Sequence, residues 1–292
     1  MRNFRIIGFA FAAVLLAGCV GGTKEDAIPV GIRFRPVIGY DTRVMESLPF
    51  PEDRTFTVWA QSEQSGALYI EKEEISYEND WSSSQCWPKS ALKFEAIWPK
   101  EVAISYSPGK GIQISDFDCT DGDVDILLAK AHSDSEVDGK LPLSFNHLLS
   151  RVDFRMHNSL AEGNTIRVTK VHLKNFAIKG SYNTIDADSW YAQSYSGART
   201  VYEVSHDDGI AIQPNSTIYI GEDFFAIPQV SLGSLEVFYD VRHGNSEWIP
   251  QIAEIENFEI VWEPGQYCTY TLKLLMDKMV STPGISSWNN RE

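Results

Sequence analysis

Short runs in which apolar and polar residues alternate are the feature that most constrains the fold of this chain. An alternating run puts its apolar side chains on one face of a β-strand and leaves the other face in water. Aromatic residues make up 12% of the sequence, and with abundant Thr, Val and Ile they favour strands over helices. The sequence therefore predicts an all-β fold. The clearest strands are expected within residues 28–34, 56–60, 92–96, 102–106, 112–114, 152–156, 166–173, 235–241, 258–262 and 270–276.

A few features interrupt or divide this pattern. The alternation changes phase around Lys170, which predicts a β-bulge there. Residues 125–131 and 146–150 look helical over a turn or two. The chain is long enough for two domains with separate cores, and the acidic, Gly-containing stretch 132–140 is the expected link. We predict an N-terminal β-sandwich over 28–138 and a C-terminal β-sandwich over 139–292.

The first 18 residues have the pattern of an export signal. Arg2 and Arg5 precede an uncharged apolar run, residues 6–17, that is too short to span a bilayer, and small residues lie directly before Cys19. We expect residues 1–18 to be removed, with 19–27 as a tether. The sequence Leu-Ala-Gly-Cys at 16–19 resembles the lipobox of bacterial lipoproteins, which implies acylation of Cys19. The alternative is an ordinary secretory signal with a coincidental Cys.

The net charge of the chain limits the classes of partner that it can bind. The formal net charge is −15, and loss of residues 1–18 would remove two arginines and no acid. Such an exterior repels phosphate groups, so we expect no nucleic-acid partner. No stretch after the signal reaches the length of a membrane helix, which leaves the acyl chains as the expected attachment.

The remaining cysteines, Cys86, Cys119 and Cys268, are odd in number and match no zinc spacing. One disulfide with one buried thiol, or three buried thiols, are both consistent with the sequence. The residues 24–26, Lys-Glu-Asp, resemble the surface-export signal of Bacteroidetes lipoproteins, or are a solvated charge cluster in a linker.

No catalytic or metal site stands out. His147 lies near Ser150 and Asp153, but the sequence has no Gly-x-Ser-x-Gly turn, and a half-buried structural histidine is the favoured interpretation. The acidic segment 116–125 could offer oxygen ligands to calcium, but it does not fit the EF-hand loop, and a solvated turn is favoured. We predict no enzyme activity, no cofactor and no metal.

The stretch 181–197 combines aromatic and polar residues, as loops that stack on sugar rings do. A well-packed surface loop has the same composition. The candidate ligand contacts are Tyr182, Trp190, Tyr191 and Tyr195.

Taken together, the motifs resemble those of the fimbrillin-like (Mfa-like) lipoproteins of Bacteroidetes. The resemblance extends over most of the chain and is most specific around Phe145, His147 and Ser150. Its motifs are the lipobox; Thr42-Arg43; Trp87-Pro88 and Trp98-Pro99 flanking Leu92-x-Phe94-x-Ala96; residues 125–129; 143–154; 168–175 with Gly180-x-Tyr182; Ile227-Pro228-Gln229; Trp262-x-Pro264-Gly265-x-x-Cys268-x-Tyr270; and Ile285-x-x-Trp288.

This resemblance implies a subunit or accessory of a type V pilus, built of two tandem antiparallel β-sandwiches of transthyretin-like, Greek-key type. In polymerising members a trypsin-like protease cuts after an Arg, the first strand leaves, and a terminal strand of the next subunit fills the apolar groove. Such strand addition combines main-chain hydrogen bonds with alternate side chains in pockets.

On this sequence the resemblance implies that Arg43 is the cut site, with Arg54 as the second choice. The displaceable first strand would carry Ile28, Val30, Ile32 and Phe34. The candidate donor tail, residues 280–292, has a thin apolar content of Val280, Ile285 and Trp288. An uncut first strand that simply completes the sandwich, as in an anchor or cap, remains open.

The predicted function is therefore a stalk, anchor or tip component of a pilus, exported as a lipoprotein to the outer membrane. Its expected partners are other fimbrillin-like subunits. The alternative is a lipid-anchored surface protein that binds a glycan or a host protein and never polymerises.

Overall fold

The structure is a computed structural model that describes residues 30–39, 47–133, 139–185, 188–192, 194–276 and 278–288. Cys19, Ile28 and Arg43 lie outside the described residues. The described part is almost entirely β-structure, with two short 3-10 turns, η1 (Tyr77–Asn79) and η2 (His206–Asp208), as its only helical segments. The strands are β1 (Gly31–Ile38), β2 (Leu48–Pro49), β3 (Phe56–Ser62), β4 (Leu68–Ile75), β5 (Ser82–Cys86), β6 (Leu92–Trp98), β7 (Ile104–Ser107), β8 (Gly111–Asp118), β9 (Leu127–Ser133), β10 (Leu141–His147), β11 (Ser150–Asn158), β12 (Asn164–Phe176), β13 (Lys179–Asn183), β14 (Ser189–Ala192), β15 (Gly197–Glu203), β16 (Ile210–Ile212), β17 (Thr217–Ala226), β18 (Gln229–His243), β19 (Ile249–Trp262), β20 (Gln266–Leu274) and β21 (Met279–Ser287).

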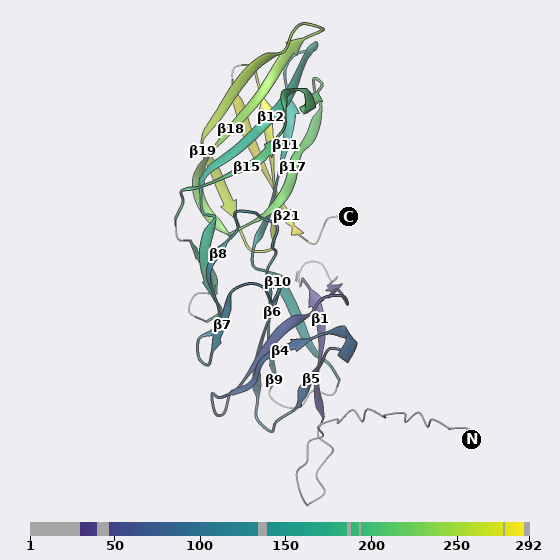
Figure 1. Ribbon diagram of the computed structural model, residues 1–292, viewed down its shortest axis with the longest axis vertical. Helices are drawn as coiled ribbons and strands as arrows, with labels where there is room; N and C mark the ends of the chain where they lie inside the picture. Colours follow the sequence, from purple (N-terminus) through teal and green to yellow (C-terminus); the bar gives the residue numbers. More distant parts are fainter. Residues whose placement is uncertain are drawn as a thin grey trace, which may run out of the picture.

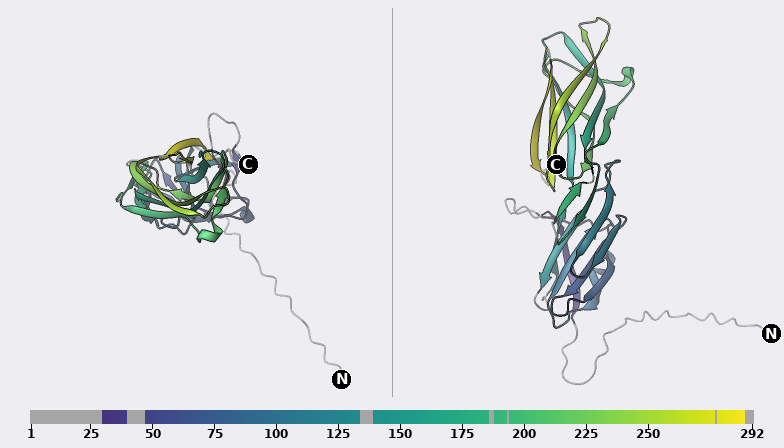
Figure 2. Two further views of the ribbon diagram at one scale, coloured as in Figure 1. Left: turned by 90° about the horizontal axis from the view of Figure 1, so that it is seen from above. Right: turned by 90° about the vertical axis from the view of Figure 1, so that its left-hand side faces the viewer.

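The strands form two lobes arranged end to end (Figure 1), and a view turned by 90° shows the same elongated shape (Figure 2). The lower lobe contains an eight-stranded sheet in the order β2-β1-β10-β9-β6-β3-β4, with β5 also paired to β1. The upper lobe contains two facing sheets, β17-β11-β20-β21 and β15-β12-β18-β19, with β16 paired to β12. The all-β fold predicted from the alternation is confirmed.

The core of the lower lobe is aromatic. The apolar faces of β1, β3, β4, β6, β9 and β10 meet in one cluster, which also takes in Phe50 and Trp81 from the connecting segments. Phe50 lies 4.9 Å from Phe145 and 5.6 Å from Phe56, measured between ring centroids. Because each large ring removes much apolar surface from water, this cluster stabilises the lower lobe.

A smaller sheet, β14-β13-β8-β7, covers the other face of the lower sheet. It packs on Trp59, Ile97 and Leu128, which point away from the aromatic core. The Glu95 carboxylate joins the two layers, because it accepts hydrogen bonds from the Ile112 N–H and the Thr184 hydroxyl at 2.8 and 2.7 Å. The hairpin β13–β14 comes from the second half of the sequence but belongs to this layer.

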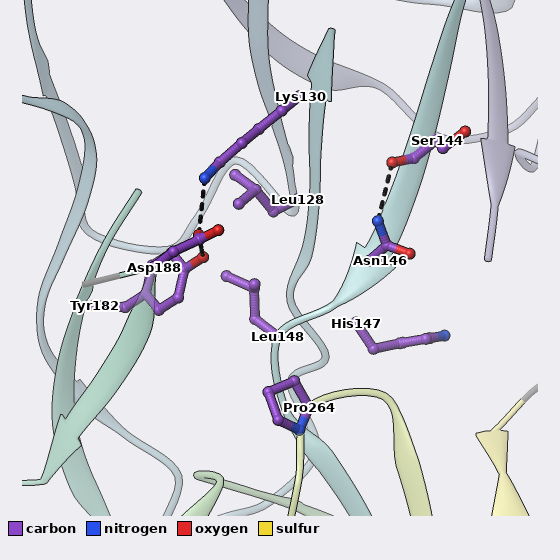
Figure 3. A pocket seen from close by; sticks show the side chains of 9 residues that line it. All are labelled: Leu128, Lys130, Ser144, Asn146, His147, Leu148, Tyr182, Asp188 and Pro264. Atoms are coloured by element: carbon purple, nitrogen blue, oxygen red, sulfur yellow. Dashed lines mark hydrogen bonds and ion pairs between the residues drawn. The ribbon is translucent and has the colours of Figure 1, made fainter. Parts of the chain in front are cut away.

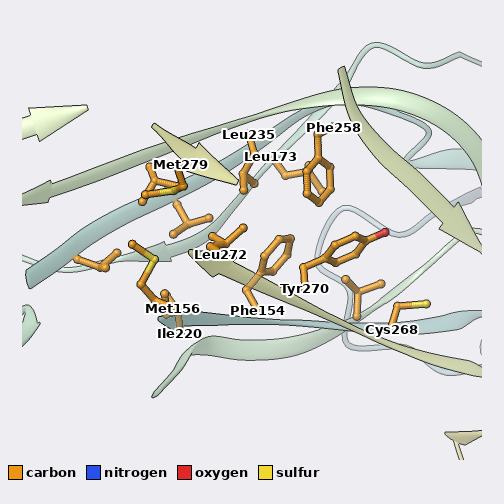
Figure 4. Packing of buried hydrophobic residues seen from close by; sticks show 14 of the residues in the cluster. Phe154, Met156, Leu173, Ile220, Leu235, Phe258, Cys268, Tyr270, Leu272 and Met279 are labelled. Carbon is orange, nitrogen blue, oxygen red and sulfur yellow. The ribbon is translucent and has the colours of Figure 1, made fainter. Parts of the chain in front are cut away.

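The core of the upper lobe lies between its two sheets (Figure 4). Phe154, Phe258 and Tyr270 form its centre, with Tyr270 at 5.4 Å from Phe154 and 4.7 Å from Phe258 between ring centroids. The residues face one another because each strand turns alternate side chains inward. The bulge predicted near Lys170 is confirmed by the shift in register between Val168 and Lys170.

Two strand pairs depart from the antiparallel arrangement that was expected. β1 runs parallel to β10, and β11 runs parallel to β20. Alternation of apolar residues sets which face of a strand is buried, but it does not encode the direction of the neighbouring strand. The sheets are therefore mixed, with mainly antiparallel pairs.

The predicted boundary at 138/139 falls between β9 and β10, which are neighbours in the lower sheet. The chain leaves that sheet at Leu148 and Leu149, so residues 139–147 belong with the N-terminal part. The pairing of β10 with β1 and β9 assigns these residues to the lower lobe, although the acidic composition of the connection suggested a domain boundary before them. The helical interpretation of 125–131 is also wrong, because Leu127–Ser133 forms β9 between β6 and β10.

Cys119 and Cys268 are buried free thiols, and Cys86 is half-buried. Burial raises the pKa of the Cys119 and Cys268 thiols to about 11 each. In the part of the chain described here, no helix is both long and apolar enough to cross a membrane.

Candidate functional site

The first described strand, β1, is a central strand and not an edge strand. β10 pairs with it on one side from Phe34 to Ile38. On the other side β5 pairs with its first half and β2 with its last two residues. Hydrogen bonds from the Phe34 N–H to the Trp81 carbonyl and from the Trp87 N–H to the Val30 carbonyl, each 2.9 Å, continue that second side. The space that β1 fills, between β10 on one side and β5 and β2 on the other, is called the slot below. Removal of β1 would leave unpaired backbone groups along both sides of this slot.

The side chains of β1 alternate strictly between core and solvent. Ile32 and Phe34 are fully buried, Pro36 is buried, and Arg33 and Arg35 are exposed. The Phe34 ring lies edge-on to Phe56 and Phe94, at 6.2 and 5.8 Å between centroids. The strand is thus an apolar plug with a cationic outer face.

The predicted plug residues are placed only in part as expected. Ile32 and Phe34 lie in the core, whereas Val30 precedes the strand and is half-buried. The strand ends at Ile38 and not before Pro36, because Pro36 is accommodated opposite Leu143 in the parallel pair. The buried set therefore shifts toward the C-terminal end, to Ile32, Phe34 and Pro36, with Ile38 partly buried.

The predicted donor tail is the edge strand of the upper lobe. β21 pairs with β20 from Gln266 opposite Ser287 to Leu274 opposite Met279. Met279 is buried, but the strand is exposed from Thr282 to Ser286, and Ile285 is 55% exposed. Ile285 lies opposite the buried Cys268, so it belongs to the core face of β21 although little covers it.

The end of this tail reaches the junction of the lobes. The indole of Trp288 stacks on the imidazole of His147 at 3.8 Å and on Phe225 at 5.1 Å. His147 is the last residue of β10, and Phe225 belongs to β17, so Trp288 contacts an element of each lobe. The imidazole Nδ1 of His147 lies 2.9 Å from an oxygen of the half-buried Asp125 carboxyl.

The His147, Ser150 and Asp153 group does not assemble as a catalytic triad. His147 is paired with Asp125, the Ser150 hydroxyl donates to the Glu263 carbonyl at 2.7 Å, and Asp153 accepts from the Tyr267 hydroxyl. The histidine has the structural role expected of it: it stacks on an aromatic ring and pairs with a carboxylate.

A cleft of about 540 Å³ lies beside this junction (Figure 3). Leu128, Leu148 and Pro264 give it an apolar side, and Lys130 and Asp188 form an ion pair of 2.8 Å at its margin. Ser144 and Asn146 of β10 line the opposite wall, and His147 points away from the centre.

The four residues of the candidate ligand loop separate into two pairs. Tyr182 is buried and Trp190 half-buried, and the Trp190 indole N–H donates to the Leu148 carbonyl at 2.7 Å. These two rings pack on each other and on the apolar layer between the small sheet β14-β13-β8-β7 and the lower sheet, so their expected role as surface stacking platforms is not supported. Tyr191 and Tyr195 are exposed by about half.

The acidic segment 116–125 is contacted by the side chain of Arg199. The Arg199 guanidinium donates to the carbonyls of Thr120 and Asp121. Gly122 lies beneath it with φ +65°, and a Cβ there would come within 2.8 Å of the guanidinium. Over the described residues no cluster of three His, Cys, Asp or Glu side chains could hold a metal ion.

The most buried ion pair belongs to the upper lobe. The Asp240 carboxylate is 1% exposed and accepts hydrogen bonds from Arg167 and from His206, at 2.7 and 3.0 Å. Burial by itself raises the pKa of Asp240, but the two hydrogen bonds outweigh it and hold the pKa below its usual value. Arg167 also stacks on Trp248, at 4.5 Å from the ring centroid.

The second-choice cut site, Arg54, lies in the connection between β2 and β3. Its guanidinium stacks over the Trp98 ring at 4.4 Å, and the backbone N–H of Arg54 donates to the Pro51 carbonyl. A cut after Arg54 would leave Phe50, a core residue, on the departing segment. Arg43, the first choice, lies between β1 and β2 and outside the described residues.

Comparison with known proteins agrees with these features. The sequence profile of the family described as fimbrillin-like matches residues 42–288. The chain belongs to the fimbrillin-like family. No curated protein sequence matches it.

Solved structures have the same fold. A fimbrial protein from Bacteroides vulgatus superposes with a TM-score of 0.65 at 14% identity, covering 88% of this chain and 99% of its own. A proposed cell adhesion protein from Bacteroides ovatus gives a TM-score of 0.55 at 16% identity, covering 90% and 99%. Another, from Bacteroides uniformis, gives 0.53 at 14%, covering 88% and 98%. The fimbrillin-like assignment made from the sequence is confirmed.

Sequence reasoning missed two parts of the site. It did not find that β1 is held on both sides, because pairing partners far along the chain leave no local pattern. It also placed His147 and Trp288 in separate motifs without bringing them together. The aromatic character of both positions was visible, but only the fold puts the end of β21 against the end of β10.

Proposed function

We propose that this fimbrillin-like protein is a structural subunit, anchor or tip component of a cell-surface pilus, assembled by exchange of its first strand. The observation that carries the proposal is β1 itself. It is a buried core strand, and the segment containing Arg43 is its covalent link to all the strands that follow. A single cut there would convert an internal strand into a separable one.

The energetics favour exchange over simple loss of the strand. Without β1, the core around Phe56 and Phe94 and the backbone of β10 and β5 would face water unpaired. Replacement by a strand from another subunit restores both the hydrogen bonds and the side-chain contacts. The slot is therefore a receptor for an extended apolar segment, and its partners are other fimbrillin-like subunits.

The N-terminal segment supplies the route to the surface. We propose that residues 1–18 direct export, that Cys19 is acylated, and that the acyl chains hold the protein on the outer membrane until the strand is cut. Several chains together give firm anchoring where one would not. A Cys19→Ser variant that still fractionates with membranes after salt and carbonate washing would contradict this part.

The cut is tested with a trypsin-like protease on the purified protein. We expect one stable cleavage after Arg43, retention of the folded remainder, and SDS-resistant ladders once strand donors are present. Arg43→Ala should abolish cleavage and ladders, and Arg54→Ala, the matched control, should leave both intact. Complete resistance of the 40–46 segment would favour an uncut anchor or cap. Cleavage without any change in assembly would contradict polymerisation by strand exchange.

A second candidate function, binding of a glycan or a host surface protein, is supported by one observation. Tyr191 and Tyr195 each expose about half of their surface to solvent. Exposed tyrosines are suited to stacking on sugar rings. Glycan arrays with the uncut protein test it: signal that disappears in the Tyr191→Ala, Tyr195→Ala double variant supports binding, and an unchanged or absent signal contradicts it.

A further inference from the structure

The tail strand β21 repeats the side-chain pattern of β1. The inward residues of β1 are Ile32, Phe34, Pro36 and Ile38. At the same spacing β21 carries, in order, Met279, Ser281, Pro283 and Ile285. Three of the four positions match in character, with a proline in the third position of both strands.

The matching residues also share a face in their own lobe. Met279, Ser281, Pro283 and Ile285 lie opposite the inward residues Leu274, Leu272, Tyr270 and Cys268 of β20. Directly opposed residues of an antiparallel pair point to the same side of the sheet. These four are therefore the core face of β21, and its last two members are exposed where they lie.

The shared proline fixes one register. A proline has no N–H, so it fits only where the neighbouring strands do not need a donor. Position 36 of the slot already meets this condition, because Pro36 itself lies there, opposite Leu143 of β10. A β21 strand seated with Pro283 at this position, parallel to β10, would place Ile285 opposite Phe145 and Ser281 opposite Leu141.

The one position at which β21 does not match β1 is the position of Phe34, the largest inward side chain of β1. Ser281 would stand where Phe34 fills the space between Phe56 and Phe94. A serine there leaves most of the aromatic volume empty and buries a hydroxyl among apolar groups. The neighbouring residues Val280 and Thr282 would point outward, as Arg33 and Arg35 do.

We propose that the Phe34 subsite determines which strand the slot accepts. A second copy of this chain can present β21 in the register set by Pro283, but Ser281 makes it a weak donor. The slot selects a donor from a different subunit, one with an aromatic residue at this position and apolar residues two places to either side. This inference rests on the proposed strand exchange and adds the identity of the partner.

The test uses the protein cut between β1 and β2, with its own β1 still bound, and measures exchange of a fluorescent peptide of residues 30–39. Competitors are peptides of residues 278–288 in three forms: the natural sequence, Ser281→Phe and Thr282→Phe. The Ser281→Phe peptide should compete about a hundredfold better than the natural tail, since it restores a large buried ring. Thr282→Phe adds the same ring to the outward face and should give no such gain. A 30–39 peptide with Phe34→Ser should lose binding to a similar extent.

The outcomes separate this inference from the proposed function. If the natural peptide of residues 30–39 exchanges into the cut protein but position 281 has no effect, or Thr282→Phe is as effective as Ser281→Phe, the selectivity of the Phe34 subsite is wrong and strand exchange stands. If no peptide of residues 30–39 exchanges at all, the slot is not a strand receptor, and both proposals fail together.

Discussion

The two terminal strands of the described chain, β1 and β21, share a pattern of residues but not a way of being held. β1 has a paired strand on each side and two fully buried side chains, whereas β21 has one paired neighbour and exposes its core face over half its length. Burial and hydrogen bonds on both sides make β1 part of the core. β21 contributes less buried surface and is hydrogen-bonded as a strand on one side, so its loss should cost less stability. The proposed strand exchange would draw on this contrast between a strand that fills a slot and a strand that lies at an edge.

The largest effect that tests this contrast is expected from Phe34→Ala. Loss of a fully buried ring from a tight aromatic cluster should destabilise the lower lobe by about 3–5 kcal/mol. Urea unfolding followed by tryptophan fluorescence measures it. Arg35→Ala, next on the same strand but exposed, is the control and should stay within about 0.5 kcal/mol. Equal effects of the two would mean that β1 is not seated as described.

The lobes should also differ in their response to acid. Asp240→Asn removes the buried partner of Arg167, and breaking such a pair should destabilise the upper lobe by about 3 kcal/mol at neutral pH. Because the pKa of Asp240 is held below 3.8 in the folded state, its contribution is complete above that value and is lost as the pH falls through the lower folded pKa.

The stability of the wild-type upper lobe should therefore fall as the pH drops below about 4, relative to the Asp240→Asn variant, whose own pH response in this range should be flatter. Hydrogen exchange of the β12 and β18 amides measures this loss of stability. Glu63→Gln, at the exposed ion pair with Lys93, serves as the control and should leave the upper-lobe curve unchanged. Parallel acid curves for wild type and Asp240→Asn would refute the assignment.

A smaller effect is expected at the end of the tail. Trp288→Ala removes the stacking on His147 and Phe225, which should weaken the docking of β21 by about 1–2 kcal/mol. Amide exchange in β21 should accelerate about tenfold or more while exchange in β1 is unchanged. Tyr191→Ala, an exposed aromatic elsewhere, should change neither strand. Faster exchange in β1 would show that the two terminal strands are coupled through the junction.

The smallest effect should come from Ile285→Ser. This residue is more than half exposed, so its loss should change the stability by no more than about 0.5 kcal/mol. The same substitution in β1, Ile32→Ser, buries a hydroxyl in the core and should be several times more damaging. Thermal unfolding gives the melting temperature of each variant. Similar melting temperatures would contradict the claim that β1 contributes more to stability than β21 does.

Much of the fold followed from local pattern. The strands around Phe56, Phe94, Phe154 and Leu235 were predicted because alternation specifies the buried face of a strand directly. Ile32 and Phe34 were expected to point inward for the same reason, and both side chains are buried. Residues 125–131 failed because a short apolar run does not distinguish a helical turn from a strand buried on both faces.

The sequence by itself determined the all-β class, the family and the identity of the side chains that fill each core. Only the tertiary structure decided that β1 runs parallel to β10 between two neighbours, that β13 and β14 return to cover the lower sheet, and that Trp288 closes the junction against His147. The physical reason is that a strand's sequence records which of its faces is dry, whereas its partner and direction depend on residues a hundred or more positions away.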